Sequence, residues 1–268
     1  MAAKSVLILG GNGKISRLLT PMLLGKGWKV TSVIRDPDQQ QAIRADAPAS
    51  GTLDVLIRSL EAVRSEADAR AIIQESNPDY VVWSAGAGGK GAPERTFAID
   101  RDAAIHFIKA SAATPSVKRF VMVSHLGSRR RKPAWWSDAD WDACRHLAEA
   151  VLPRYYQAKL AADEVLHREG RTGRPDFVAV CLRPGTLTDG PAGPVDLGRT
   201  AAGTGKVSRA SVAEVAAALL ELDDERAAGV RNSWLDLLDG GEDVQGAVAR
   251  VARERVDAAP GEPVFEEE

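Results

Sequence analysis

Residues 5–36, SVLILGGNGKISRLLTPMLLGKGWKVTSVIRD, decide the fold. An apolar run at residues 6–9 precedes a glycine-rich turn, a segment with apolar residues at helical spacing, and a second expected strand at residues 29–34. An entirely apolar strand is typical of a parallel sheet that helices cover on both faces. We therefore expect this stretch to open a doubly wound α/β sheet.

The glycine-rich turn fits two registers of a phosphate-binding pattern. Gly11, Gly13 and Ser16 fit G-x-G-x-x-(small residue), and Gly10 can replace Gly11 in a register one residue longer. In either register glycine lets backbone N–H groups approach a pyrophosphate at the helix N-terminus, where the helix dipole favours an anion. We expect a nucleotide there; the alternative is a tight turn without a ligand.

The end of the second expected strand, at residues 35 and 36, indicates which dinucleotide binds. Arg35 stands where an arginine pairs with the 2′-phosphate of NADP, and Asp36 follows it, where an acidic residue accepts from the ribose 2′-OH of NAD. Arg17 could add a second positive charge. NADP is the favoured cofactor, and NAD remains the alternative.

Strands and helices alternate along the rest of the chain, which predicts a doubly wound parallel sheet, a Rossmann fold. We expect one domain over residues 1–258, in which residues 186–258 cover the substrate and residues 186–204 form a mobile lid. Residues 259–268 contain two prolines and several glutamates, so we expect a disordered acidic tail. The expected strands are 53–60, 80–84, 119–124, 178–182 and 234–238, and the expected helices include 39–50, 61–76, 96–112 and 244–256.

Small residues follow the fourth expected strand. The run AGAGG at residues 85–89 begins with Ala85 and Gly86. At the carboxyl end of a strand such a run lets a ligand lie against the backbone. We expect Ala85 and Gly86 to contact the cofactor; a flexible loop is the alternative.

Tyr155 and Lys159 are the candidate catalytic pair. They are four residues apart in a segment with helical spacing, so both project from one face. A tyrosine with a pKa near ~10 is a poor acid or base at neutral pH unless its phenolate is stabilised. We expect Lys159 to lower the pKa of Tyr155 and to hold the nicotinamide ribose.

The chain resembles the short-chain dehydrogenase/reductase superfamily, specifically its atypical branch with NmrA-like and flavin-reductase-like members. The resemblance covers nearly the whole chain in the family's order. It rests on GGNGKISR at 10–17, VIRD at 33–36, WSAGAGG at 83–89, VKRFVMVSHLGS at 117–128, YYQAKLAADEVL at 155–166, LRPG at 182–185 and VSRASVAEVAAALLE at 207–221.

The resemblance implies roles for particular residues. It implies that Arg183, Pro184 and Gly185 lie beside the nicotinamide. The residues that it assigns to the pyrophosphate are Gly10, Gly11, Gly13 and Ile15.

The serine of the family's catalytic set matches Ser124 only loosely. In active members the hydroxyl often lies a residue or two further on, where this chain has His125 and Leu126. Ser124 or His125 could polarise a substrate carbonyl, or the site could lack that help.

The segment before Tyr155 is unusual in composition. It holds the basic run at residues 129–132, followed by Trp135, Trp136 and Trp141. The tryptophans could wall an apolar substrate pocket or serve as packing. The basic run could favour an anionic substrate or be a solvated loop.

Composition limits the partners that we expect. The chain is 44% hydrophobic and 27% charged, with a formal net charge of −2, so it has no basic field suited to nucleic acid. No apolar run approaches the ~20 residues that span a bilayer, and no signal-peptide pattern is apparent. We expect a cytoplasmic protein that binds a small-molecule substrate and no metal, and that could form a homodimer. The two cysteines have no zinc-site or redox-pair spacing.

These features predict an NADP(H)-dependent oxidoreductase that acts on a carbonyl or hydroxyl group of a small molecule. A cofactor-binding sensor of the NmrA type and a nucleotide-sugar epimerase are the alternatives.

Overall fold

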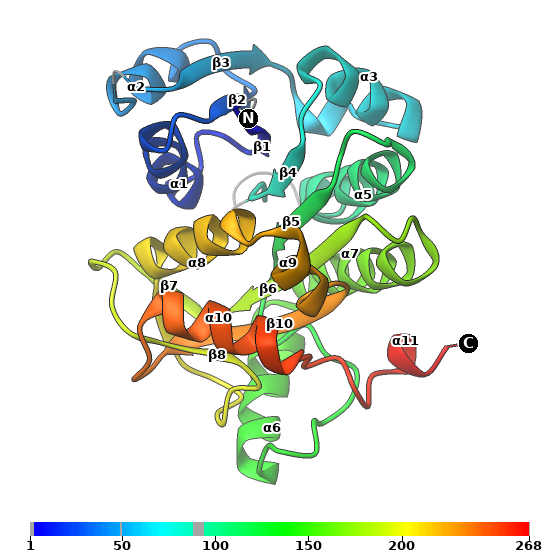
Figure 1. The fold of residues 1–268 in the computed structure, drawn as a ribbon. Helices are drawn as coiled ribbons and strands as arrows, with labels where there is room; N and C mark the ends of the chain where they lie inside the picture. The colour runs from blue at the N-terminus through cyan, green and yellow to red at the C-terminus, as the bar shows by residue number, and fades with distance from the viewer. Residues whose placement is uncertain (1–2, 49, 88–93, 268) are drawn as a thin grey trace.

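The structure is a computed structural model that describes residues 3–48, 50–87 and 94–267. Its main sheet has eight strands in the order β3-β2-β1-β4-β5-β6-β10-β8 (Figure 1). Every neighbouring pair is parallel except β10 and β8, so the prediction of a doubly wound α/β sheet is confirmed. The strands are β1 (Ser5–Leu9), β2 (Lys29–Ile34), β3 (Thr52–Ile57), β4 (Tyr80–Trp83), β5 (Arg119–Val123), β6 (Val178–Pro184), β8 (Val195–Gly198) and β10 (Ser233–Asp239).

Helices cover both faces of this sheet, which accounts for its mostly apolar inner strands. One layer holds α1 (Lys14–Gly25), α8 (Arg209–Glu221) and α10 (Val244–Glu254) (Figure 1). The other holds α3 (Glu66–Ser76), the π-helical η2 (Phe97–Ala103), α5 (Ala104–Ala113) and α7 (Pro153–Thr172). The shorter helices are α2 (Gln39–Ala45), η1 (Leu60–Ala62), α4 (Glu94–Thr96), α6 (Asp138–Arg145), η3 (His146–Val151), α9 (Asp224–Gly229) and α11 (Pro263–Glu266).

The site follows from the order of the strands. The chain builds β1, β2 and β3 outward in one direction and then returns to place β4 on the other side of β1. Loops diverge at such a switch point, and open α/β sheets bind ligands there, outside the carboxyl ends of the strands. The glycine-rich turn after β1 lies at this position.

Residues 186–204, where we expect a mobile lid, contain two strands. Within them β7 (Thr186–Thr188) pairs with β9 (Lys206–Ser208), and β8 extends the main sheet through antiparallel pairing with β10. Val195 and Leu197 are each 1% exposed, so alternate apolar side chains fix β8 against the core.

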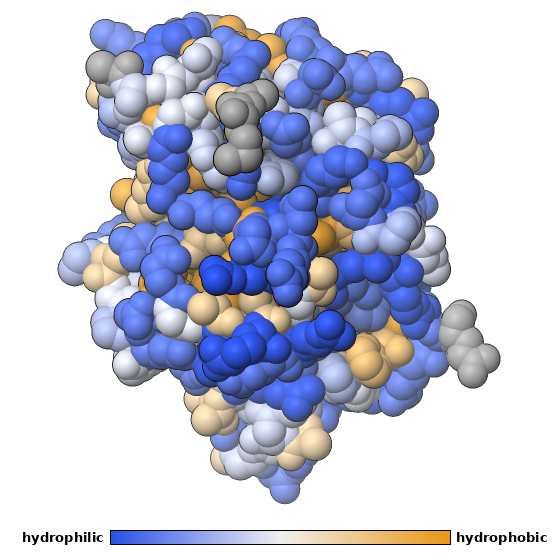
Figure 2. Space-filling view, viewed as in Figure 1, coloured by the Kyte–Doolittle hydropathy of each residue, from blue (hydrophilic) through white to orange (hydrophobic). Residues whose placement is uncertain are grey.

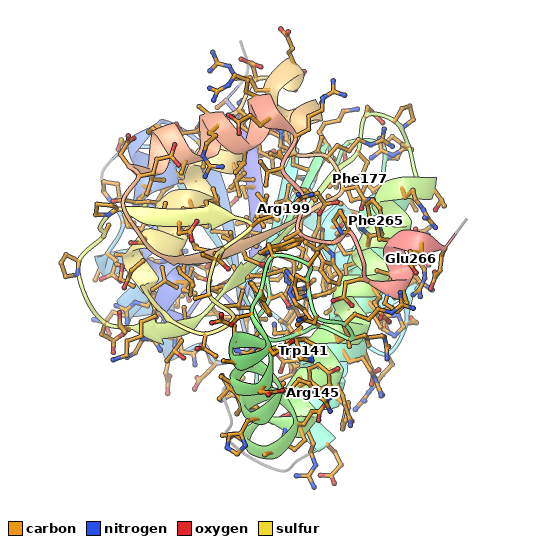
Figure 3. All side chains as sticks on the ribbon, turned by 90° about the horizontal axis from the view of Figure 1, so that it is seen from below. Trp141, Arg145, Phe177, Arg199, Phe265 and Glu266 are labelled. Carbon is orange, nitrogen blue, oxygen red and sulfur yellow. The ribbon has the colours of Figure 1, made fainter. Side chains whose placement is uncertain are left out.

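The C-terminal segment also differs from the expected disordered tail. Ala259 and Val264 are buried, and the Glu262 carboxylate accepts the backbone N–H groups of Arg130 and Arg131. Figure 3 shows Phe265 and Glu266 on α11, away from Trp141 and Arg145 on α6. The acidic residues therefore serve as acceptors for the basic segment that begins at residue 129.

The face drawn in Figure 2 is mainly hydrophilic, with smaller apolar areas between the polar side chains. None of the described helices is long and apolar enough to cross a bilayer.

Candidate functional site

The glycine-rich turn is shaped by close contacts that exclude side chains. Gly10 has φ of +88°, and a Cβ atom there would lie 2.6 Å from the Cα atom of Ala85. A Cβ atom on Gly11 would lie 1.9 Å from the Oγ atom of Ser32, and the Gly11 N–H already donates to Val33 O at 2.8 Å. Gly10 therefore lets the turn approach the loop after β4, whereas Gly11 lets it approach β2.

The N-terminus of α1 offers free backbone donors beside this turn. Arg17 N–H is the first to bond within the helix, to Gly13 O at 2.9 Å, which leaves the N–H groups of Lys14, Ile15 and Ser16 without intrahelical acceptors. Gly13 provides no side-chain cap, and the first turn has no acidic residue. These donors and the helix dipole suit a pyrophosphate.

A cavity of about 430 Å³, which we call the cofactor cleft, extends from this turn along the carboxyl ends of β2, β3 and β4. Its size is in the range of small-molecule sites. Expected residues that line it are Gly10, Gly13, Arg35, Ala85 and Gly86, and residues that sequence reasoning missed are Asn12, Lys14, Arg58, Glu61, Ala87 and Arg95. Residues 88 and 89 of the expected small-residue run lie outside the described residues.

Cationic side chains gather at the end of the cofactor cleft formed by the residues after β2 and β3. Arg35 follows β2 and Arg58 follows β3, and both line the cleft. The Arg35 guanidinium lies 3.5 Å from Glu61 Oε1, which also contacts Arg95 at 2.6 Å. Asp36, the residue that would favour NAD, instead accepts the backbone N–H of Asp38 at 3.0 Å.

Arg17 does not contribute to this charge. Its guanidinium pairs with Asp46 at 2.6 Å, and it does not line the cofactor cleft. Lys14, one turn earlier, does line the cleft and pairs with Asp189 at 2.6 Å, where both side chains are mostly exposed. Lys14, the first residue of α1, therefore lies nearer the expected phosphates than Arg17, the fourth.

Tyr155 and Lys159 lie one turn apart on α7, as the spacing predicted. The Lys159 Nζ atom is 5.6 Å from the centre of the Tyr155 ring, donates to Val123 O at 3.2 Å, and forms an ion pair with Asp100 Oδ1 at 3.3 Å. Lys159 is 2% exposed and Asp100 is fully buried. Asp100, on η2, was missed because its role depends on a contact between two elements.

The same spacing continues down α7. Asp163 and His167 follow at four-residue steps, and both are buried. We call Tyr155, Lys159, Asp163 and His167 the α7 column. Residues four apart lie on one helix face, so the sequence contained the signal for the whole column.

Burial and nearby charges together shift the pKa values of Tyr155 and Lys159. Burial raises the pKa of Tyr155; Lys159 opposes this effect, and Asp100 and Asp163 add to it. Burial lowers the pKa of Lys159, but the charges of Tyr155, Asp100 and Asp163 outweigh burial, so the pKa is raised overall. Lys159 is therefore a protonated cation at neutral pH.

Ser124 is engaged with Asp163 rather than free. Its Oγ donates to Asp163 Oδ1 at 2.5 Å. Burial raises the pKa of Asp163 to about 6, although Arg183 and Ser124 oppose this shift. A hydroxyl whose proton is held by a carboxylate cannot donate that proton to a substrate carbonyl.

His125 lies beside the Tyr155 ring. Its ring centre is 5.7 Å from that of Tyr155, and its Nδ1 accepts the backbone N–H of Gly127 at 3.1 Å. Burial, followed by the charges of Arg183 and Lys159, lowers the pKa of His125 to about 4. His125 is therefore a neutral imidazole at pH 7, with Nε2 as its proton donor.

Arg183 is occupied by an interior ion network. Its guanidinium pairs with Asp163 at 2.6 Å and with Asp236 at 3.2 Å, and all three side chains are 0% exposed. The Pro184 carbonyl accepts from Leu126 N–H, and a Cβ on Gly185 would lie 2.5 Å from Leu238. These contacts join β6 to β10 and to the loop after β5, and the guanidinium faces carboxylates rather than the cofactor cleft.

The basic run has acidic partners of its own. Arg129 is buried and pairs with Asp236 at 2.6 Å, whereas the other three members pair with side chains nearer the surface. Those pairs are Arg130 with Glu164, Arg131 with Glu266, and Lys132 with Asp138. The run thus anchors its own loop.

The tryptophans in this loop pack against the protein. Trp136 is 3% exposed and its indole N–H donates to Thr200 O at 2.9 Å. Trp135 lies over the Arg129 and Arg199 guanidinium groups, and Trp141 packs beside Arg145 on α6 (Figure 3). The packing interpretation therefore fits these contacts.

The described residues contain no cluster of His, Cys, Asp or Glu suited to a metal ion. They do fit a dinucleotide, because a glycine turn that excludes Cβ atoms places uncapped helix N–H groups on a cationic cleft. The fold and this cleft define a protein of the dinucleotide-binding α/β class.

The chain belongs to the NAD(P)H-binding family, whose sequence profile matches residues 10–223. This agrees with the atypical short-chain dehydrogenase/reductase branch.

Individual relatives extend over nearly the whole chain. The UPF0659 protein C216.03 of Schizosaccharomyces pombe is 31% identical over 91% of this chain and 93% of its own length. The uncharacterised sugar epimerase YhfK of Bacillus subtilis is 28% identical over 92% and 99%. A solved structure from Bacillus halodurans, named as an NAD-dependent epimerase/dehydratase, is 26% identical, with a TM-score of 0.70 over 94% of this chain and 100% of that one.

Proposed function

We propose that this protein is an NADP(H)-dependent oxidoreductase that interconverts a carbonyl and a hydroxyl group on a small molecule. The observation that carries the proposal is a continuous set of contacts from the cofactor cleft to the α7 column. Ala87, which lines the cleft, donates its N–H to Asp100 at 2.9 Å, and Asp100 pairs with Lys159 beside Tyr155. Cofactor and proton donor would thus meet at one edge of the sheet.

The residues divide the work between binding and proton transfer. The N–H groups at the start of α1 would hold the pyrophosphate, and Lys14 adds a positive charge there. A bound nicotinamide would supply or accept a hydride. Tyr155 would exchange the proton at the substrate oxygen, and His125 could donate a second hydrogen bond to that oxygen.

Two arginines support NADP over NAD. Arg35 and Arg58 approach the adenosine end from neighbouring strands, and guanidinium groups suit a 2′-phosphate. Asp36, by contrast, accepts a hydrogen bond in its own loop. We expect Arg35→Ala to weaken NADPH binding about tenfold or more and to change NADH binding little. Fluorescence titration with both nucleotides measures this, and equal losses for both would contradict NADP selectivity.

Turnover tests the reaction class. Purified protein is assayed for NADPH oxidation with aldehydes, quinones and flavins. We expect Tyr155→Phe to abolish turnover while NADPH still binds, because the substitution removes only a hydroxyl. Unchanged turnover in this variant would remove Tyr155 from the reaction; binding without turnover on any substrate would favour a sensor.

An epimerase is the second candidate, because YhfK and the Bacillus halodurans protein carry epimerase names. An epimerase returns the hydride to its substrate and retains its dinucleotide. Nucleotide released by denaturing freshly purified protein distinguishes the two: stoichiometric NAD favours the epimerase, and freely exchanging NADP favours the reductase.

A further inference from the structure

We propose that Asp100 is a positioning residue that holds the Lys159 ammonium and so keeps Tyr155 as a neutral phenol, the form that gives a proton to a carbonyl oxygen. The inference rests on the proposed role of Tyr155 as the proton-exchanging group. It goes beyond that role in two ways. The site favours reduction over oxidation, and the residue responsible for this preference lies outside the Tyr155–Lys159 pair.

The first step is the geometry of Asp100. One carboxylate oxygen accepts Ala87 N–H at 2.9 Å, and the other lies 3.3 Å from Lys159 Nζ. A Cβ on Gly86 would lie 2.9 Å from the same Oδ1 atom, so the loop after β4 closes directly over the carboxylate. Asp100 is 0% exposed and cannot turn to solvent without moving that loop.

The second step is the balance of charge around Tyr155. From α7 it is influenced by Lys159 and Asp163, and from η2 by Asp100. His125, from the loop after β5, contacts the ring and is neutral at pH 7. Arg183, on β6, is paired with Asp163. One cation therefore faces Tyr155 together with two carboxylates, so Lys159 cannot stabilise a phenolate as an unpaired lysine would.

The third step is the consequence for chemistry. In the reduction, a carbonyl that accepts a hydride at carbon takes the Tyr155 proton at oxygen, the Tyr155 O–H bond breaks, and solvent water reprotonates the phenolate. A neutral phenol is ready for this direction at pH 7. The oxidation needs the phenolate first, which the two carboxylates disfavour. The site is thus poised for reduction.

The test measures Tyr155 directly, without cofactor or substrate. The chain has three tyrosines, so protein labelled with ¹³C at tyrosine Cζ gives three signals, which the Tyr80→Phe, Tyr155→Phe and Tyr156→Phe variants assign. A pH titration then gives the pKa of Tyr155. In Asp100→Asn, which keeps an acceptor for Ala87 N–H, we expect that pKa to fall by about one unit or more.

Asp102→Asn is the matched control. Asp102 lies two residues along η2, pairs with Arg101 and is partly exposed, so its loss should leave the Tyr155 titration unchanged. An unchanged or raised pKa of Tyr155 in Asp100→Asn would overturn the inference, as would an equal fall in Asp102→Asn. If Asp100→Asn does not fold, the wild-type titration decides: a pKa of Tyr155 below the ordinary value near ~10 overturns it, and one above supports it.

A failure of the proposed oxidoreductase function is recognised separately. It would appear as absent turnover with every substrate, whereas the titration reports only the ionisation of Tyr155. A lowered pKa in Asp100→Asn together with absent turnover would support the charge arrangement and remove the reductase role.

Discussion

The cofactor cleft and the α7 column both depend on charged side chains, and they differ in how much water reaches those charges. Arg35 and Glu61 in the cleft are 54% and 36% exposed, whereas Arg183 and Asp163 at the column are fully buried. Exposed pairs contribute little to stability and exchange partners easily, but a buried charge that loses its partner costs several kcal/mol. The cleft is therefore suited to exchanging a ligand, and the column to holding fixed positions.

The largest expected effect on stability comes from removing a buried charge beside the α7 column. Arg183→Met leaves the Asp163 carboxylate buried without its ion-pair partner, while Asp236 keeps Arg129, so we expect the free energy of unfolding to fall by about 3–5 kcal/mol. Arg35→Met, the matched change in the cleft, should lower it by less than about 1 kcal/mol. Urea unfolding measures both, and equal losses would contradict the distinction.

The next effect concerns the backbone of the cleft. Gly10 and Gly27 both have positive φ, but a Cβ on Gly10 would lie 2.6 Å from Ala85 Cα, whereas Gly27 has open space around it. Gly27→Ala should therefore lower the free energy of unfolding only by the backbone strain of a positive φ, about 1–2 kcal/mol. Gly10→Ala should cost more and also abolish NADPH binding, because the turn must shift. Unfolding and nucleotide titration check this; retained binding in Gly10→Ala would show that the turn tolerates the shift.

The same comparison explains what the sequence could predict. Local patterns predicted β2 as residues 29–34, placed Arg35 at its end, and placed Tyr155 and Lys159 on one helix face. These features depend on period and order along the chain. Arg58 was missed because the third strand was expected to reach residue 60, whereas it ends at Ile57. Glu61 was expected to begin a long helix, whereas it lies in the short η1.

Contacts between distant segments account for the other differences. The role of Asp100 arises only where η2 meets α7, and the order of the C-terminal segment arises because Glu262 accepts N–H groups of the loop at residues 130–131. Neither partner is close in sequence, and an isolated acidic residue gives no periodic signal. The buried role of Arg183 was hidden for the same reason, because Asp236 lies on β10.

A smaller effect tests the lower end of the α7 column by pH. His167 is 3% exposed, neither ring nitrogen has a hydrogen-bond partner among the described residues, and burial, with Arg171 and Arg168, lowers its pKa to about 4. The unfolded chain, with a pKa near ~6.5, binds more protons between these values. The stability that depends on a neutral His167 is therefore fully present above pH 6.5, and the free energy of unfolding falls as the pH drops toward 4.

Replacing this histidine should remove that part of the acid sensitivity. In His167→Phe the apolar ring suits the neighbouring Trp234 and Phe265. Between pH 6.5 and 4 we expect the free energy of unfolding of this variant to fall by about 2–3 kcal/mol less than that of the wild type. Urea unfolding across this range measures the slope. His146→Phe, at an exposed position, is the control. If it changes the dependence of unfolding free energy on pH as much as His167→Phe does, burial of His167 is not the cause of the acid sensitivity.

The smallest expected effect on stability concerns Glu61 in the cofactor cleft. There the exchange of ion-pair partners should matter more for ligand binding than the strength of each pair matters for stability. Glu61 contacts Arg35 at 3.5 Å and Arg95 at 2.6 Å, so it competes with an incoming phosphate for Arg35. Glu61→Gln should change the free energy of unfolding by less than about 1 kcal/mol but raise NADPH affinity several-fold, with little change for NADH. Glu66→Gln, which removes a pair with Arg70 on α3, should alter neither affinity. Equal gains in affinity for both nucleotides would place the competition at the pyrophosphate, because NADH has a pyrophosphate but no 2′-phosphate.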